Sequence, residues 1–323
     1  MSQAAVSEQE FIALYREVQS SSGMAKRLGI ALKNVQARRR HIERKYQIVL
    51  PQRDHRPAYN TATISDDRIE FSMNIRDGIV IIAGDQHYWP GSVPTLHRAQ
   101  IALCKKLKPA LVVNNGDSFD GASVSRFPDI GHETKPTVQQ EIDNLSERLD
   151  EILKASPSAK HVWNLGNHDM RYETYLAARV PQYKGVEGMH LKDHFPGWIP
   201  SWFVTINPGE SSHTEIRHRE KGGIHAGYNN TLHSGINIVT GHDHRADVVR
   251  FDDRRGHRYA IRTGMLADSC RDGSFVNYLE GRKVNWQSAF PVLTYRDGRL
   301  MAPEHCWRVD DNTVEFRGEL IRV

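Results

Sequence analysis

Residues 79–87 read IVIIAGDQH, an apolar run that ends, after a glycine, in an aspartate and a histidine. Three later segments follow the same plan: LVVNNGDSFDG at 111–121, HVWNLGNHD at 161–169 and INIVTGHDH at 236–244. Short apolar runs that alternate with amphipathic stretches such as 137–153 predict the strands and helices of a layered α/β sheet. Because ligands of such sheets bind beyond the carboxyl ends of the strands, we expect the polar residues after these runs to gather in one place.

The residues after the four runs have side chains that commonly bind metals. In chain order they are Asp85, His87, Asp117, Asp120, Asn167, His168, Asp169, His242 and His244. Carboxylates, neutral imidazoles and an amide oxygen suit divalent ions such as Mn²⁺, Zn²⁺, Fe²⁺ or Ni²⁺. A glycine before each cluster allows the tight turn that brings strand-end side chains toward one point. Each motif alone is common by chance, whereas the ordered set indicates a metal centre.

The motif order D-x-H, G-D-x-x-D, G-N-H-D, a lone histidine and G-H-x-H resembles that of the calcineurin-like metallophosphoesterases, over roughly residues 78–264. The resemblance implies a two-sheet β-sandwich flanked by helices, in four αββα layers. It also implies two divalent metal ions, for which we expect Mn²⁺, with Zn²⁺, Fe²⁺ or Ni²⁺ as alternatives. The implied chemistry is hydrolysis of a phosphate ester by a hydroxide that bridges the two metals.

Carried over by position, the resemblance assigns two ligand sets that share one aspartate. The first set is Asp85, His87, Asp117 and His244, and the second is Asp117, Asn167, His218 and His242. It further implies that His168 faces the scissile phosphate, that Asp169 orients this histidine, and that Asp120 supports the ligands from behind. Arg171 and Arg245 are candidates for phosphate contact, with plain solvent exposure as the alternative.

The lone histidine of the fourth motif has three candidates: His213, His218 and His225. The sequence TEIRH at 214–218 reads as a short strand that ends in His218, which favours that residue. Arg219 stands where relatives usually have a glycine, so His225 stays open as the alternative.

The first part of the chain is strongly basic. Over residues 1–58, 11 basic residues face 5 acidic ones, whereas the whole chain carries a net charge of +4. Helical spacing predicts three short helices, over 11–18, around 25–28 with a stop at Gly29, and over 32–46. Residues 20–48, SSSGMAKRLGIALKNVQARRRHIERKYQI, resemble the helix-turn-helix domains of bacterial and phage DNA-binding proteins.

That resemblance implies DNA as a partner of an all-α N-terminal domain. The expected DNA-binding residues are the largely outward basic side chains of the third helix: Lys33, Arg38, Arg39, Arg40, Arg44 and Lys45. An interaction or packing module is the alternative, because a basic helix face can also be simply solvated.

Three domains are therefore expected: a helix-turn-helix-like domain over 1–48, a linker or arm over 49–77, and a metallophosphoesterase domain over 78–323. After Gly264 the pattern is rich in β-strands. We expect a hairpin over 290–300 that turns at Asp297 and Gly298, and one terminal strand within 313–323. Trp286, Phe290 and Trp307 are expected in the core.

Composition restricts the class of protein. Apolar residues make up 39% and charged residues 25% of the 323 residues, as in globular proteins. No segment has the roughly 18 apolar residues of a membrane span, and Met1–Glu10 lacks the pattern of a signal peptide. Cys104, Cys270 and Cys306 do not suggest a disulfide framework. We therefore expect a cytoplasmic protein without membrane contact.

The leading functional hypothesis is a phosphodiesterase or nuclease that acts on DNA. A phosphatase or cyclic-nucleotide phosphodiesterase is the second hypothesis, since the metal motifs do not specify the substrate. A DNA-binding regulator with a silent phosphoesterase fold is the third, and the intact set of ligand residues speaks against it. Oligomeric state and the mode of any nuclease attack do not follow from the sequence.

Overall fold

The computed structural model describes residues 6–48, 50–51, 70–127, 134–268 and 284–323. The chain forms two compact units, a small one covering the described residues up to 51 and a large one that begins at residue 70. Most of the expected linker, residues 52–69, lies outside the described residues, as does Cys270. Cys104 and Cys306 are buried free thiols.

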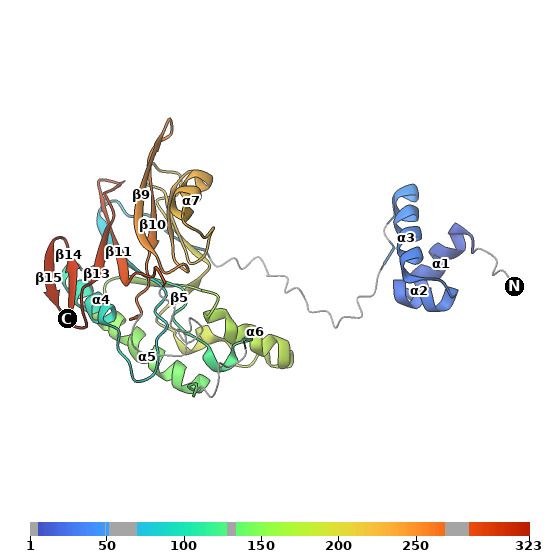
Figure 1. Ribbon diagram of the computed structural model, residues 1–323, viewed down its shortest axis with the longest axis horizontal. Coiled ribbons are helices and arrows are strands. Elements are labelled where there is room, and N and C mark those ends of the chain that lie inside the picture. The colour runs from blue at the N-terminus through green and yellow to red at the C-terminus, as the bar shows by residue number, and fades with distance from the viewer. Residues whose placement is uncertain (1–5, 49, 52–69, 128–133, 269–283) are drawn as a thin grey trace. The chain divides into compact units, whose positions relative to one another are not determined.

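The small unit consists of helices α1 (Glu8–Val18), α2 (Ser21–Leu28) and α3 (Leu32–Tyr46), which confirms the predicted helices (Figure 1). Ser7 and Glu10 form a capping box at the start of α1, and α2 ends at Gly29 in the left-handed conformation. One apolar face of each helix contributes to a common core. The buried core residues are Phe11, Tyr15, Met24, Val35, Ile42 and Leu50.

Among the described residues, the large unit has two sheets, and the larger one has nine strands. Its main path runs β15 (Glu319–Arg322), β14 (Thr313–Phe316), β13 (Glu304–Arg308), β11 (Ala289–Arg296), β2 (Gly78–Ala83), β3 (Leu111–Asn115), β4 (Lys160–Asn164) and β5 (Ile199–Ser201), and β12 (Arg299–Leu300) pairs with β11. The strands β2 to β5 are parallel, so their carboxyl ends lie at the same edge.

The second sheet has six strands. Its order is β1 (Glu70–Met73), β6 (Phe203–Ile206), β7 (Thr214–Arg217), β8 (Asn237–Thr240), β10 (Gly256–Thr263) and β9 (Ala246–Asp253). Strand β1 lies inside the expected linker over 49–77, yet it pairs in parallel with β6. Asn207 adds two hydrogen bonds to the backbone of Ile75, at 2.6 and 2.9 Å. The large unit therefore begins before the predicted boundary at Gly78.

Helices cover the outer faces of both sheets, which confirms the four-layer α/β architecture (Figure 1). They include α4 (Thr95–Leu107), α5 (Val138–Ala155) and α7 (Ala226–Ser234). Helix α6 (Asp169–Arg179) packs mainly on the short 3₁₀ turns at Ala122–Val124, Pro181–Tyr183 and Leu191–His194. Helices α4 and α5 contribute to a core with the nine-stranded sheet, and α7 packs on β8, β9 and β10. Ile142, Leu145, Leu149 and Ile152 of α5 are buried on one face, as the helical spacing predicts.

Strand β2 explains why the apolar runs are continuous. Ile81 and Ala83 belong to the core beneath the helices, whereas Val80 and Ile82 belong to the core between the two sheets. Both faces of the strand are therefore buried, so no polar residue is needed within the run. The predicted strands at 79–83, 110–113, 161–165 and 236–240 are confirmed as β2, β3, β4 and β8 within one or two residues.

The C-terminal region differs from expectation in one point. The hairpin of β11 and β12 turns at Asp297 and Gly298 as predicted. The segment 313–323, however, forms two strands, β14 and β15, because Arg317 and Gly318 both adopt positive φ and reverse the chain. Phe290 is fully buried and Trp307 is half-buried. In the described residues, no helix has the length and apolar character to cross a membrane.

Candidate metal centre

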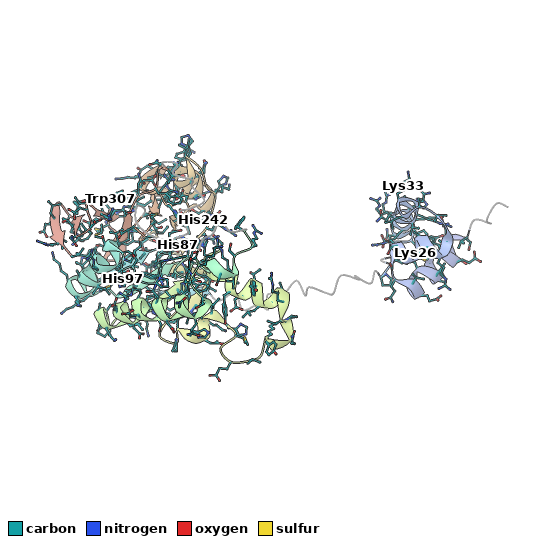
Figure 2. All side chains as sticks on the ribbon, turned by 60° about the horizontal axis from the view of Figure 1, so that its bottom comes forward. Lys26, Lys33, His87, His97, His242 and Trp307 are labelled. Carbon is teal, nitrogen blue, oxygen red and sulfur yellow. The ribbon has the colours of Figure 1, made fainter. Side chains whose placement is uncertain are left out.

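The loops after β2, β3, β4 and β8 meet at one place in the large unit, marked by His87 and His242 in Figure 2. Backbone hydrogen bonds join the loops directly. The N–H of Asp85 donates to the carbonyl oxygen of Gly116 at 2.9 Å, and the N–H of His87 donates to the backbone carbonyl oxygen of Asp117 at 2.9 Å. Gly241 N–H likewise donates to the carbonyl oxygen of His218 at 2.9 Å. The position of each loop therefore depends on its neighbour, as expected where parallel strand ends adjoin.

In the part of the chain that the structure describes, three groups of aspartate and histidine side chains have ligand atoms within 4.8 Å of one another. The groups are Asp85 with His87 and His244, Asp117 with His218 and His242, and His87 with Asp120 and His168. The first two groups contain every aspartate and histidine that the sequence assigned to the two ligand sets. Asp85, Asp117 and His218 are buried, whereas His242 is exposed at the edge of the site.

The two buried aspartates make corresponding contacts. One oxygen of Asp85 accepts the N–H of His242 at 3.0 Å, and the other lies 3.2 Å from Nε2 of His244. One oxygen of Asp117 accepts the N–H of His168 at 2.8 Å, and the other lies 3.1 Å from Nε2 of His218. In each carboxylate a neighbouring loop fixes one oxygen, and the second oxygen faces a histidine nitrogen.

Several buried polar atoms in the site have no hydrogen-bond partner among the described residues. They include Oδ1 of Asp85, Oδ1 of Asn167 and Nε2 of His218. Leaving such an atom unsatisfied costs about 1–3 kcal/mol. The close approaches of His218 to Asp117 and of His244 to Asp85 therefore lack hydrogen-bond geometry. Ligand atoms that converge without bonding to one another fit a divalent cation between them.

The charges of the site also fit a cation. Burial opposes protonation of His218, but the charge of Asp117 and its contact with the ring outweigh burial and raise the pKa of His218 to about 10. Burial lowers the pKa of His87, so this imidazole is neutral near pH 7 and has a lone pair for a metal. The carboxylates therefore favour a positive partner, which a proton or a divalent ion can supply.

The backbone at the aspartate and histidine ligands is unusual. Residues Asp85, His87, Asp117, His242 and His244 have φ values of 54°, 42°, 54°, 73° and 57°. For L-residues this left-handed region costs about 1–2 kcal/mol, although aspartate and histidine enter it more readily than most residues. Strained backbone of this kind concentrates at functional sites, where the surrounding structure holds it in place.

Two glycines allow the close approach of the loops. A Cβ on Gly166 would lie 2.1 Å from Oδ1 and 2.4 Å from N of Asp117. A Cβ on Gly116, which has φ of 85°, would lie 2.4 Å from the ring of His218. Any side chain at either position would push a candidate ligand out of place.

Hydrogen bonds fix the orientation of two ligand histidines. Nδ1 of His218 lies 2.7 Å from the carbonyl oxygen of Asn115, to which it donates, so Nε2 is left for a metal. Nδ1 of His87 lies 3.0 Å from Oδ1 of Asp120, which fixes the ring in a similar way. Such partners fix the tautomer and raise the basicity of the ligand nitrogen. Asp120 therefore lies against His87 on the side of its Nδ1.

The third group places His168 beside the two ligand sets. Its Nδ1 lies 2.9 Å from the same Oδ1 of Asp120, and its Nε2 lies 3.0 Å from Nη2 of Arg171. Burial lowers the pKa of His168, but the hydrogen bond to Asp120 and the charge of Asp117 outweigh burial and raise it overall. Arg171 also donates to the carbonyl oxygen of Asp120 at 2.8 Å, so its guanidinium is part of the site.

The predicted role of Asp169 is wrong, because Asp120 holds His168 instead. The Asp169 carboxylate accepts the N–H groups of Asp117, Ser118, Phe119 and Gly166 at 2.9, 3.0, 2.9 and 2.7 Å, and the indole N–H of Trp163 at 3.3 Å. Its position at the start of α6 lets it bind the loop after β3 from below. Asp169 therefore fixes the backbone of Asp117, whereas Asp120 contacts His168.

The alternatives for the lone histidine lie elsewhere. His218 follows β7 and joins Asp117 and His242, whereas His225 is exposed at the start of α7. His213 precedes β7 and, like His225, belongs to none of the three groups. Arg245 is half-buried, and its backbone N–H is bonded to Asp243 at 3.1 Å.

Sequence reasoning missed a segment that supports His244. The ring of Trp286, expected in the core, lies edge-on to that of His244 with centroids 4.4 Å apart. The N–H of Gln287 donates to the carbonyl oxygen of His244 at 2.8 Å, and its Oε1 accepts the N–H of Ala246 at 2.7 Å. Residues 286–287 therefore hold the left-handed turn at His244. Because residues 286–287 are far from His244 in the sequence, no local pattern predicted this contact.

The six basic residues assigned to DNA binding fall into two groups of three in the small unit. Arg38 stacks on Phe11, Arg39 bonds to Glu43 at 2.9 Å, and Lys45 bonds to Glu8 at 2.7 Å. These contacts stabilise the unit itself, and Arg38 and Arg39 are half-buried rather than outward. The other three, Lys33, Arg40 and Arg44, are exposed; Lys33 is marked in Figure 2.

Comparisons with known proteins reveal phage relatives. No protein-family model matches the chain. The chain is 28% identical to the Gene 54 protein of Mycobacterium phage L5 over 227 residues. The matched region covers 64% of this chain and 85% of the relative. For the Gene 54 protein of Mycobacterium phage D29 the identity is 26% over 222 residues, with the same shares. Wild-type Vps29 of Entamoeba histolytica, solved in complex with zinc, matches with a TM-score of 0.39 and 13% identity, over 76% of this chain and 98% of that one.

Replacing Gly166 by alanine is expected to disrupt the loop of Asp117. The new Cβ would lie 2.1 Å from Oδ1 of Asp117, which requires a backbone shift. We expect a loss of about 1–3 kcal/mol in the free energy of unfolding, together with loss of bound metal. Urea denaturation and elemental analysis after Mn²⁺ loading measure both. Gly185→Ala is the matched control, because its Cβ meets nothing within 4 Å. Equal stability and metal content in the two variants would contradict the close-approach argument.

Trp286→Phe is expected to remove most of the change in tryptophan fluorescence when Co²⁺ binds. The indole lies 4.4 Å from the ring of His244, and a partly filled d shell at that ligand quenches a nearby excited indole. A titration of the apoprotein with Co²⁺, followed by fluorescence, measures the effect. Trp307→Phe serves as the control and should keep the quenching. Quenching in the Trp286 variant equal to that of the wild type would contradict a position of Trp286 beside the bound Co²⁺.

Proposed function

We propose that the chain is a dinuclear metal-dependent phosphoesterase of the calcineurin-like kind. The observation that carries the proposal is the pairing of Asp85, His87 and His244 with Asp117, His218 and His242 at adjoining strand ends. The buried oxygen of Asn167 has no hydrogen-bond partner among the described residues and completes the second set. Two divalent ions bound there, with Mn²⁺ expected, would activate water and neutralise charge on the phosphate.

The proposed ligands form two sets around a shared aspartate. Asp85, His87, Asp117 and His244 would hold one ion, and Asp117, Asn167, His218 and His242 would hold the other. Support for the sharing comes from the central place of Asp117. Its oxygens face His168 N–H and His218 Nε2, and three backbone N–H groups of its loop donate to Asp169 and fix that loop.

His168 is the proposed proton donor to the leaving group. Its Nδ1–H is directed at Asp120, and its Nε2 accepts from Nη2 of Arg171; once that guanidinium binds the phosphate instead, Nε2 would be left to carry a second proton. The raised pKa favours that second proton. Nε2–H would then protonate the departing oxygen, while the guanidinium of Arg171 binds a negatively charged phosphate oxygen. Both groups are already held by Asp120, which limits their reorganisation during the reaction.

We further propose that the substrate is a phosphodiester in DNA. Support comes from the small unit, in which Lys33, Arg40 and Arg44 fall along one stripe of α3, opposite the buried Val35 and Ile42. A basic face on the last helix of such a bundle suits binding to duplex phosphates. The small unit would then bring the metal centre to DNA as a tethered binding domain. The mycobacteriophage relatives are compatible with this proposal.

The ester chemistry is tested with bis-p-nitrophenyl phosphate in the presence of Mn²⁺. We expect turnover by the wild type and a loss of at least about 1,000-fold in Asp117→Ala, because the shared ligand is removed. Asp150→Ala, an exposed aspartate on α5, is the control for the loss of a carboxylate. Absence of turnover by the wild type with Mn²⁺, Zn²⁺, Fe²⁺ and Ni²⁺ in turn would contradict the proposed function.

DNA binding by the small unit is tested with the triple variant Lys33→Ala, Arg40→Ala, Arg44→Ala. We expect weaker binding to a duplex and a logarithmic salt dependence shallower by up to about 3, because three phosphate contacts are lost. Fluorescence anisotropy over a salt series measures both effects. Arg27→Ala is the control, since Arg27 pairs with Glu17 at 2.8 Å. A triple variant that binds like the wild type would rule out this face of α3.

A further inference from the structure

An exposed loop follows one of the proposed metal ligands. Residues 219–225 connect His218 to α7, and every one of them is exposed. The loop begins at the site itself, since the ring of His218 lies 5.3 Å from that of His242 and its carbonyl oxygen is bonded to Gly241. Gly222 and Gly223 meet no neighbour at their Cβ positions within 4 Å. The loop therefore forms part of the rim of the metal centre.

The rim loop presents unpaired positive charge. Its one acidic side chain, Glu220, lies 3.0 Å from Nη1 of Arg217, which neutralises it from the neighbouring strand. Arg219 and Lys221 have no ion pair with any described residue. Two exposed cations thus stand directly beside a site that is proposed to bind phosphate. Such an arrangement suits additional phosphate groups on either side of the one that reacts.

Apolar side chains continue from the rim loop along α7. Ile224, Tyr228 and Leu232 are 75%, 47% and 46% exposed, and they recur every four residues. Tyr228 and Leu232 lie one turn apart on the same face of α7, whereas Ile224 lies just before the helix in the rim loop. Tyr228 packs edge-on against Phe251 of β9 at 5.2 Å, which holds the aromatic ring in place while part of it stays exposed. Figure 1 shows α7 beside β9 and β10.

We infer that this surface binds a single-stranded stretch of nucleic acid that leads into the metal centre. The surface, called here the α7 platform, consists of Arg219, Lys221, Ile224, Tyr228 and Leu232. Cations next to an ordered exposed aromatic ring match a polyanion with exposed flat bases, which stack on such rings. A duplex hides its base faces, and a small phosphate ester would not reach along α7. The inference rests on the proposed phosphoesterase function and specifies its substrate class.

Each residue of the α7 platform would contact a different part of the bound strand. Arg219 is adjacent in sequence to His218 and would contact the phosphate nearest the reacting one. Lys221 would contact a phosphate further along the strand, and Tyr228 would stack on an unpaired base. Single-stranded binding on this surface is separate from duplex binding by α3, so the two surfaces would select different parts of one partly unpaired substrate.

Tyr228→Ala tests the stacking contact with a labelled 12-nucleotide single-stranded DNA. We expect KM for its hydrolysis, and Kd from anisotropy in Ca²⁺, to rise about tenfold, which is the usual loss for one stacked base. Turnover of bis-p-nitrophenyl phosphate should fall far less, since that ester lacks bases. Tyr228→Trp should restore binding, because stacking needs only an aromatic face. Tyr183→Ala, which truncates a tyrosine with 45% exposure elsewhere, is the control.

The double variant Arg219→Gln, Lys221→Gln tests the cations on the same oligonucleotide. We expect its logarithmic salt dependence to be shallower by about 1.4, the contribution of two phosphate contacts on a single strand. If the wild type cleaves the small ester but both sets of variants bind the oligonucleotide normally, the α7 platform is overturned and the phosphoesterase stands. If the wild type cleaves neither, the proposed function itself fails. A change of oligomeric state in Tyr228→Ala would show that a second copy covers the surface and would likewise overturn the inference.

Discussion

The large unit depends on accommodating two buried carboxylates, Asp85 and Asp117, at the point where two sheets meet. An uncompensated buried charge costs several kcal/mol, so the fold must supply partners for both groups. It does so in the same way twice, with one oxygen bound by a backbone N–H of another loop and the other facing a histidine. Left-handed turns and glycine contacts follow from this requirement, because only they bring the loops close enough. Stability and the metal centre are thus two aspects of one arrangement.

Much of this arrangement could be predicted because its signals are local. Strand β2 is buried on both faces, so it reads as a continuous apolar run, and Asp85 and His87 follow it within four residues. The same holds for Asp117, Asn167 and His242. Even His218, chosen among three histidines, was favoured by a local feature, the short strand before it. The features that could be predicted best are therefore those that depend on residues close together in the sequence.

What could not be predicted depends on contacts between distant segments or on side-chain length. Asp169 is three residues after Gly166, yet its role follows from the fold of the loop after β3, which binds it with three N–H groups. Trp286 reaches His244 only in the folded chain. Arg38 and Arg39 flank the buried Val35 and Ile42 on α3, and their long side chains fold back onto Phe11 and Tyr15, so the outward position expected for them is wrong. Strand β1 is too short for its pattern to stand out, and its pairing with β6 alone defines it.

The contact of residues 286–287 with His244 affects the order in which the site forms during synthesis. A chain emerging from the ribosome completes β2, β3 and β4, with Asp85, Asp117 and Asn167, well before the residues that finish the site. His244 can hold its turn only once Gln287 has been made and has left the ribosome. Domains fold as units during synthesis, from the N-terminus onward. The cluster around His244 is therefore unfinished until nearly all of the chain exists, so a metal ion that binds there would be bound by a completed molecule.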